Sequence, residues 1–249
     1  MRRAYLWSAA LVVLSLLNMR IPAGASPRDE DLFLRPDDMH TVLFGSLDVG
    51  RSIFVSGGVK RTLTGPLDRS DFVAIETSGM GLTRERYDAT PGIGSMRVTT
   101  ESASLLGYQW AGDRLYAALY AGPEIHQEQL TIAAVAQRWS KPRLGLRGLA
   151  ELWANPTQDT LVTATVQAGS TRGSVYGRIS ARYRVWRNLY AGPEAGIYTT
   201  ETYRETKLGA HVTGLKLGIF QFRFSGGMQT QDDRRHPSPY VGMTSWIRL

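Results

Sequence analysis

From Thr41 to its last residue the chain alternates apolar and polar positions with a period of two. In Ser174–Trp186, one alternate set holds Val, Gly, Ile, Ala, Tyr and Val, whereas the other set carries Arg178, Arg182 and Arg184. Successive side chains of a strand point to opposite faces of a sheet. The segment therefore predicts a β-strand that separates an apolar face from a basic one.

The hexapeptide LYAGPE occurs twice, at Leu119–Glu124 and at Leu189–Glu194. In both copies the alternation places the proline on the apolar face and the glutamate on the polar face. Proline inside a strand indicates a bend or a strand end. An acid on the polar face can meet the arginines of a neighbouring strand, so we expect Glu124 and Glu194 to form ion pairs.

The same alternation predicts a series of strands about ten residues long. The candidate segments are residues 42–48, 52–63, 70–79, 101–110, 114–126, 142–153, 159–168, 174–186, 189–199, 206–216, 219–229 and 239–248. If residues 42–63 form one bent strand or an accessory hairpin, about ten strands remain. Tight turns are expected at 111–114 and 187–188, and long loops at 80–100 and 127–141.

Two architectures keep the apolar faces of such strands away from water. A soluble barrel or sandwich turns the apolar faces inward, whereas a transmembrane barrel turns them toward lipid and lines its interior with the polar faces. Small and aliphatic residues dominate the apolar faces, aromatic residues often lie near segment ends, and the last strand reaches the final residue. These features favour an all-β, antiparallel up-and-down transmembrane β-barrel of about 10–12 strands.

The N-terminus has the layout of a secretory signal peptide. Arg2 and Arg3 precede an apolar run over residues 4–17, which is followed by the small residues Ala23 and Ala25 of the expected cleavage site. This run is shorter than the roughly 20 residues of a spanning helix, which disfavours the alternative of an uncleaved anchor. We expect cleavage after Ala25, a flexible lead-in over 26–40, a β-barrel domain over 41–249, and a location in the outer membrane of a Gram-negative bacterium.

Charge and composition narrow the function classes. The formal net charge is +7, but removal of residues 1–25 takes away three arginines and no acid, which leaves 26 basic against 22 acidic residues, or +4. These charges are interspersed rather than clustered, so nucleic acid is not an expected partner. The chain has no cysteine and its four histidines are scattered. No disulfide, metal site or cofactor is expected.

The polar faces supply the candidate site residues. A charged network is expected inside the barrel, and aromatic residues on the same faces are candidates for stacking on sugar rings. The charged candidates are Glu101, Glu124, Glu151, Glu194, Arg143, Arg147, Arg178, Arg182, Arg184 and Arg223, and the aromatic candidates are Tyr116, Tyr120, Trp153, Trp186 and Tyr190. They form either a charged channel or saccharide track, or an ion-pair network that fills a narrow interior. The second interpretation is favoured, because charges in a low dielectric must be paired.

Six short segments follow one another along the chain: FGSLDVGRS at 44–52, GYQW at 107–110, GLRGLAELWANPTQDT at 145–160, LYAGPE at 189–194, KLGAHVTGLKLG at 207–218 and FSGGMQTQDD at 224–233. In this order they resemble the cellulose biosynthesis protein BcsS family. The resemblance covers about residues 41–245. It implies an outer-membrane protein associated with bacterial cellulose synthesis and secretion. Its implied partners are membrane lipid, cellulose or other glucan chains, and cellulose-secretion subunits.

Two function classes follow from the sequence. The first is a non-enzymatic scaffold, anchor or narrow pore that supports cellulose or other exopolysaccharide export. The second is an outer-membrane hydrolase or acyltransferase acting on lipid or glycan, suggested by His126 two residues after Glu124. No GxSxG-type elbow accompanies this pair, so a catalytic site is not predicted. A soluble periplasmic binding barrel would require the apolar faces to turn inward.

Overall fold

The computed structural model describes residues 39–86, 94–132, 136–232 and 236–249. The predicted signal peptide and nearly all of the lead-in lie outside these residues. The described chain forms strands β1 (Thr41–Val49), β2 (Ser52–Thr62), β3 (Asp71–Arg86), β4 (Gly94–Ala111), β5 (Leu115–Ile132), β6 (Ala136–Trp139), β7 (Arg143–Thr157), β8 (Thr160–Gly169), β9 (Ser174–Trp186), β10 (Leu189–Thr199), β11 (Arg204–Leu217), β12 (Phe220–Gln231) and β13 (Ser238–Arg248). Among these residues no helix is long and apolar enough to cross a membrane.

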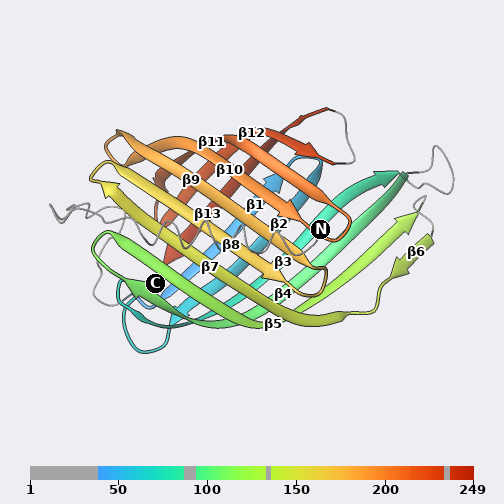
Figure 1. Cartoon of the computed structure of the whole chain (residues 1–249), viewed down its shortest axis with the longest axis horizontal. Coiled ribbons are helices and arrows are strands. Elements are labelled where there is room, and N and C mark those ends of the chain that lie inside the picture. Colours follow the sequence, from blue (N-terminus) through green and yellow to red (C-terminus); the bar gives the residue numbers. More distant parts are fainter. Residues whose placement is uncertain (1–38, 87–93, 133–135, 233–235) are drawn as a thin grey trace.

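The strands form one antiparallel sheet that closes on itself (Figure 1). Its order is β4-β3-β2-β1-β13-β12-β11-β10-β9-β8-β7-β5, and β5 pairs again with β4. The first and last strands are joined by backbone hydrogen bonds between Thr41 and Leu249, at N···O distances of 2.8 and 3.0 Å. Twelve strands thus make a closed barrel, while the short β6 pairs only with the end of β5. The predicted fold class is confirmed.

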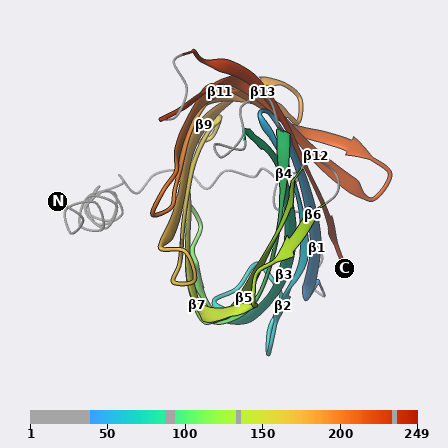
Figure 2. The same ribbon diagram turned by 90° about the vertical axis from the view of Figure 1, so that its right-hand side faces the viewer.

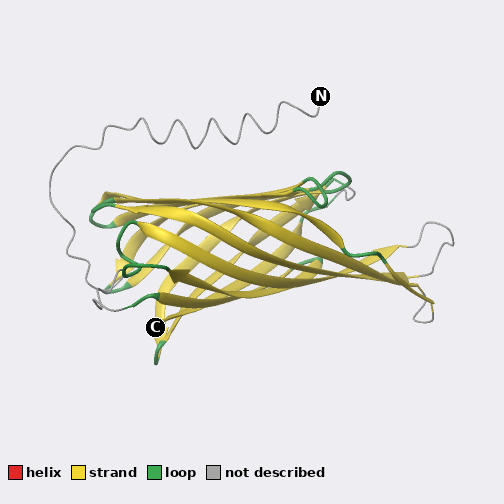
Figure 3. Ribbon diagram, turned by 90° about the horizontal axis from the view of Figure 1, so that it is seen from below, coloured by secondary structure: helices red, strands yellow, loops and turns green. Residues whose placement is uncertain are grey.

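The barrel is oval in cross-section, and its strands are inclined to its long axis (Figures 2 and 3). One end, called the short-turn end below, holds Thr41, Leu249 and the tight turns that include residues 112–114 and 187–188. The opposite end, called the long-loop end below, is where β3, β5 and β12 end. The turn predicted at 187–188 is confirmed, and Arg187 there adopts a positive φ of 41°.

The predicted loops at 80–100 and 127–141 are largely wrong. β3 continues to Arg86, β4 begins at Gly94, and β5 runs to Ile132 before β6. Residues 94–100, GSMRVTT, are rich in β-branched side chains and pair with both neighbouring strands. The glycine and proline residues that suggested a loop are confined to a few positions, and cross-strand pairing dominates on both sides of them. These strands extend the long-loop end on one side of the barrel (Figure 1).

The two faces of the sheet differ as a lipid-facing barrel requires. On β7 the outward Leu144 and Leu146 are 81% and 69% exposed, whereas the inward Arg147 is only 5% exposed. On β5 the inward Glu124 is 2% exposed. Apolar residues therefore cover the outside and charged residues line the interior, the opposite of a soluble barrel. A smaller apolar cluster, which includes Val73, lies inside against β3, β4 and β5.

Candidate functional site in the barrel interior

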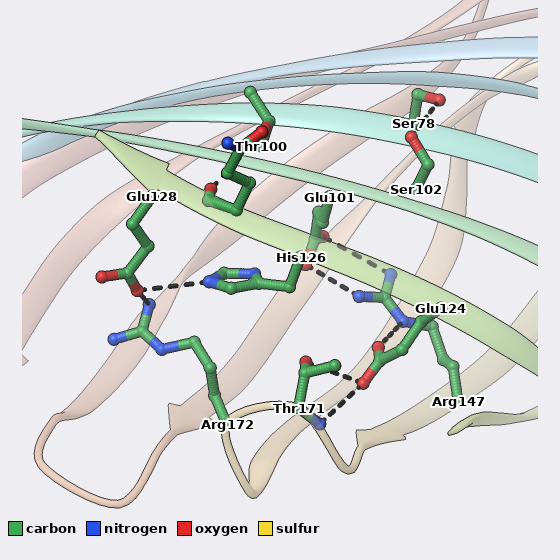
Figure 4. A network of polar contacts seen from close by, with 11 residues as sticks. Ser78, Thr100, Glu101, Ser102, Glu124, His126, Glu128, Arg147, Thr171 and Arg172 are labelled. Atoms are coloured by element: carbon green, nitrogen blue, oxygen red, sulfur yellow. Dashed lines mark hydrogen bonds and ion pairs between the residues drawn. The ribbon is translucent and has the colours of Figure 1, made fainter. Parts of the chain in front are cut away.

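Arg147 joins two of the predicted acids at the long-loop end of the interior. Its Nε donates to Glu124 Oε2 at 2.8 Å, and its Nη2 donates to Glu101 Oε2 at 2.8 Å. The three residues come from β7, β5 and β4, whose alternation turns them to the same side (Figure 4). One guanidinium therefore holds two carboxylates, in the fork geometry that suits arginine.

Glu124, the acid of the first LYAGPE copy, is fully engaged. Its Oε1 accepts hydrogen bonds from the backbone N and the Oγ1 of Thr171, at 2.9 and 2.8 Å (Figure 4). Gly169 makes room for this carboxylate, because a Cβ there would lie 2.8 Å from Glu124 Oε2. The carboxylate thus ties β5 to β7 and to the turn between β8 and β9.

His126 pairs with Glu128 rather than with Glu124, which the sequence had suggested as its neighbour. His126 Nε2 lies 3.2 Å from Glu128 Oε1. Glu128 also accepts from Arg97 Nη1 at 2.6 Å and lies 3.0 Å from Arg172 Nη1. Within the described structure no serine hydroxyl hydrogen-bonds to His126, and no group of three His, Cys, Asp or Glu residues has the arrangement of a metal site.

The second LYAGPE acid, Glu194, organises the middle of the interior. Its Oε2 accepts from Arg223 Nη2 at 2.6 Å and its Oε1 accepts from Tyr240 Oη at 2.9 Å. His211 is fully buried beside it, with Nδ1 3.8 Å from Glu194 Oε2. The ion pairs predicted for both hexapeptide copies are thus confirmed, since Glu124 pairs with Arg147 and Glu194 pairs with Arg223. A proline at the preceding outward position leaves the acid's own orientation unchanged.

Lys60 spans the interior near the short-turn end. Its Nζ lies 2.6 Å from Tyr116 Oη and 3.1 Å from Glu151 Oε2. Tyr116 Oη is in turn 3.0 Å from Tyr120 Oη. β2 and β7 are not neighbours in the sheet, so the Lys60–Glu151 pair is a bridge across the lumen rather than a contact along the wall.

Arg182 and Arg184 lie among the predicted aromatic residues. The Arg182 guanidinium is 5.8 Å from the Trp153 ring centre and 5.9 Å from that of Tyr190. It is 4% exposed, and its Nε and Nη2 have no hydrogen-bond partner among the described residues. Arg184 Nε donates to Tyr190 Oη at 3.1 Å. Four of the five aromatic candidates therefore face the interior, where hydroxyl groups or cations contact them.

Three candidates lie apart from these clusters. Trp186 is 67% exposed, because a bulge at Val185, near the end of β9, pairs it with the outward-facing Leu189. Arg143 begins β7 and is exposed. Arg178 faces inward but forms no ion pair within 4 Å in the described part of the chain. The carboxylates that attract its guanidinium from farther away include Glu194 and Asp48.

Several interior residues were missed from the sequence. Asp48 and Lys207 form an ion pair of 2.6 Å between β1 and β11, which are not neighbours in the sheet. Lys207 also lies 3.3 Å from Glu205. The strict alternation of β1, β2 and β11 would have put Asp48, Lys60 and Lys207 on inward faces. Nothing in the sequence pairs them, because their contacts depend on closure of the barrel.

Several charged side chains of the interior are partly accessible to solvent. The inward side chains of Glu101, Lys207 and Asp48 are 24%, 23% and 36% exposed. Ion pairs between elements that are not neighbours in the sheet lie at separate places: Lys60–Glu151 near the short-turn end, and Lys207–Asp48 and Arg172–Glu128 toward the long-loop end. The interior therefore contains charged side chains that are partly exposed and paired with one another.

A comparison of the sequence with protein-family models adds a second line of evidence. Residues 42–249 match the model of the family described as cellulose biosynthesis protein BcsS. The chain belongs to this family. The BcsS match spans the barrel from β1 to the last residue, so the charged interior is part of the family domain. No individual curated protein matches the sequence.

Solved structures agree with the fold of this BcsS-family chain. The toluene transporter TodX of Pseudomonas putida superimposes with a TM-score of 0.54 at 8% identity, over 89% of this chain and 93% of that one. The transport unit of the autotransporter AIDA-I from Escherichia coli gives 0.52 at 10% identity, over 97% of each chain. The beta domain of the Bordetella autotransporter BrkA gives 0.50 at 13% identity, over 85% and 98%. At these identities the likeness concerns the fold alone, which is the barrel of outer-membrane proteins.

Proposed function

We propose that this BcsS-family barrel is an outer-membrane component that supports cellulose biosynthesis and export as a scaffold, anchor or narrow pore, without catalysing a reaction. The observation that carries the proposal is the Lys60–Glu151 bridge across the lumen, at 3.1 Å. A wide polymer channel would keep its charged groups on the wall. Here charges from β2 and β7, which three strands separate in the sheet, meet inside the barrel. Such a contact narrows the interior and braces the barrel.

Targeting follows from the same account. Residues 1–25 act as a signal peptide that is cleaved after Ala25, residues 26–40 form a lead-in, and residues 41–249 insert as the barrel domain. The outward leucines of β7 then meet lipid. Since outer-membrane barrels commonly place short turns on the periplasmic side, the short-turn end faces the periplasm. The long-loop end faces the cell exterior.

Partners are proposed from the family and from the interior aromatic residues. Cellulose or another glucan, and subunits of the secretion machinery, are the expected partners, while nucleic acid is not. Tyr116, Tyr120, Trp153 and Tyr190 are candidates for contacts with sugar rings near the short-turn end. In the present structure they contact one another and nearby cations, so a glucan would have to displace such contacts.

A complementation experiment tests the proposal. A strain lacking the protein is supplied with wild type, Arg182→Ala, His126→Ala or the exposed control Arg143→Ala, and cellulose is scored by dye binding. The amount of protein in the outer-membrane fraction is measured in parallel. Loss of cellulose in the deletion strain, and restoration by the wild type and by His126→Ala, would support a non-catalytic role.

A catalytic role would give a different result. If His126→Ala alone abolished cellulose dye binding while its amount in the membrane equalled that of the wild type, an enzyme acting on lipid or glycan would replace the scaffold. No contact of His126 favours that alternative, because its partner among the described residues, Glu128, offers a carboxylate and not a nucleophile. If the deletion strain kept normal cellulose, both forms of the proposal would fail.

A further inference from the structure

Glu76 is an acidic residue on the outer, mainly apolar face of this barrel. It is on β3, where it pairs with Ser104 of β4 and Val59 of β2, and the alternation turns all three outward. Its side chain is exposed. Among strand residues whose side chains the structure describes, every other acid lies on an inward face. A lone outward carboxylate therefore needs an explanation.

The position of Glu76 lies within the apolar belt. At the short-turn end the outward Phe72, Tyr108 and Trp110 form an aromatic cluster with ring centres 5.1 and 5.0 Å apart, as expected at a membrane interface. Glu76 is four residues beyond Phe72 on the same strand. At 3.3 Å per residue and a tilt of about 40°, this places it about 10 Å inside the belt, whose height is about 25 Å.

A row of small residues crosses the outer surface beside Glu76. Register pairs Ser245 with Gly45, Gly45 with Gly57, Gly57 with Ser78 and Ser78 with Ser102, so the row runs over β13, β1, β2, β3 and β4. We call it the small-residue groove. Larger outward side chains, among them Leu43 and Val59 on one side and Val55 and Met80 on the other, border it. A hollow of about 280 Å³ lined by Gly57, Glu76, Ser78 and Ser102 lies within it.

The polar groups of the groove are only partly satisfied by the barrel itself. Ser104 Oγ donates to Glu76 Oε2 at 2.6 Å, and Ser78 and Ser102 hydrogen-bond to each other at 2.8 Å (Figure 4). Glu76 Oε1 accepts no hydrogen bond from the described residues. The nearest outward cation, Arg61, pairs with Ala74 in register and forms no ion pair with Glu76. It is one residue from the end of β2, where its head group can reach the interface.

A carboxylate facing hydrocarbon is costly, and the cost falls when a cation or donor covers it. Small residues at a membrane-embedded surface allow another backbone to approach closely and pack. The groove combines both features on one wall, while the outward face of β8 presents only Val162, Ala164, Val166 and Ala168.

We propose that the small-residue groove is the docking surface for a second membrane protein, whose lipid-embedded surface brings a lysine or arginine against Glu76. Charge complementarity selects this occupant: the groove offers one carboxylate and several hydroxyls, and no cation of its own. A second copy of the chain related by a twofold axis would not supply one, since the outward cations Arg61, Arg84 and Arg204 lie near strand ends. The proposal rests on the proposed insertion into the outer membrane.

Site-specific photo-crosslinking tests this docking surface. Because the chain lacks cysteine, Ser102→Cys provides one attachment site for a benzophenone maleimide in full-length protein in its native outer membrane. Ala164→Cys on β8 is the matched control position. The expected product is an adduct from position 102 alone, whose partner peptide, identified by mass spectrometry, is a membrane-spanning stretch containing lysine or arginine.

Variants in the groove decide whether Glu76 is responsible. Glu76→Gln should lower the yield of this adduct about tenfold or more, while Arg61→Gln should leave it unchanged. Gly57→Leu should also remove it by filling the groove, because a Cβ there meets only a backbone oxygen at 3.4 Å. Heat-modifiable gel mobility confirms that each variant is folded.

Four outcomes would overturn the proposal: an adduct with lipid only, an adduct with a second copy, an adduct that persists in both Glu76→Gln and Gly57→Leu, or one lost equally in Arg61→Gln. Fractionation separates this proposal from the proposed function. A chain found outside the membrane defeats both, whereas an inserted chain without a position-102 adduct defeats only the docking surface.

Discussion

The ammonium group of Lys60 on β2 lies 3.1 Å from the carboxylate of Glu151 on β7, across the lumen of the barrel. Both side chains are mostly buried, at 16% and 23% exposure. Removal of one partner leaves the other charge in a low dielectric. We expect Glu151→Gln to lower the free energy of unfolding by about 1–3 kcal/mol, measured by urea denaturation in lipid vesicles. An unchanged midpoint would show that solvent already screens this pair.

Removing both partners of that bridge should widen the passage. The Lys60→Ala, Glu151→Ala double variant loses the ion pair that crosses the lumen near the short-turn end. We expect its single-channel conductance in planar bilayers to exceed that of the wild type. Arg143→Ala, at the exposed start of β7, serves as the control. Equal conductance of the double variant and the wild type would contradict a constriction at Lys60.

Arg147 should be the interior cation whose loss costs most. Its guanidinium is 5% exposed and holds Glu101 and Glu124 together. Arg147→Gln leaves two carboxylates close to each other, so we expect destabilisation by about 3–5 kcal/mol. Arg143→Gln, an exposed neighbour on the same strand, should change stability by no more than about 0.5 kcal/mol. Urea denaturation of the two variants side by side gives the comparison, and equal stabilities would remove the network from the account.

The alternation of a single strand was enough to predict which residues line the interior. Glu124 and Glu194 could be placed from their own hexapeptides, because one residue of register decides the face of every side chain on a strand. Trp186 could not be placed in this way, since a bulge near the end of β9 turns it outward. A bulge is a feature of two paired strands, so the alternation of one strand alone does not reveal it.

The ion pairs that cross the lumen could not be predicted from the sequence for a different reason. Lys60 and Glu151 are separated in the sheet by β3, β4 and β5, and their meeting depends on the number of strands and the stagger at closure. The lengths of β3 and β4 were also underestimated. Their ends contain glycine and charged residues that suggest loops, whereas pairing between two long neighbours maintains the strands.

A charge introduced at an outward position in the middle of a strand should lower the stability of the barrel in lipid. Ile179 on β9 is flanked by Ala164 of β8 and Ala195 of β10 on the outer surface. Ile179→Arg should destabilise the barrel in lipid vesicles by about 2–4 kcal/mol, the cost of a cation near the bilayer midplane. Tyr183→Arg, four residues nearer the short-turn end, should cost less. Equal and negligible effects at both positions would argue for a water-exposed surface.

The most direct test of the inside-out arrangement is a spin-label scan along β8. Single cysteines at residues 162–166 are introduced into the cysteine-free chain, the protein is placed in lipid vesicles, and label collisions with oxygen and with a water-soluble nickel complex are measured. The account predicts high oxygen accessibility at 162, 164 and 166 and high nickel accessibility at 163 and 165. The opposite alternation, or high nickel accessibility at all five positions, would contradict it.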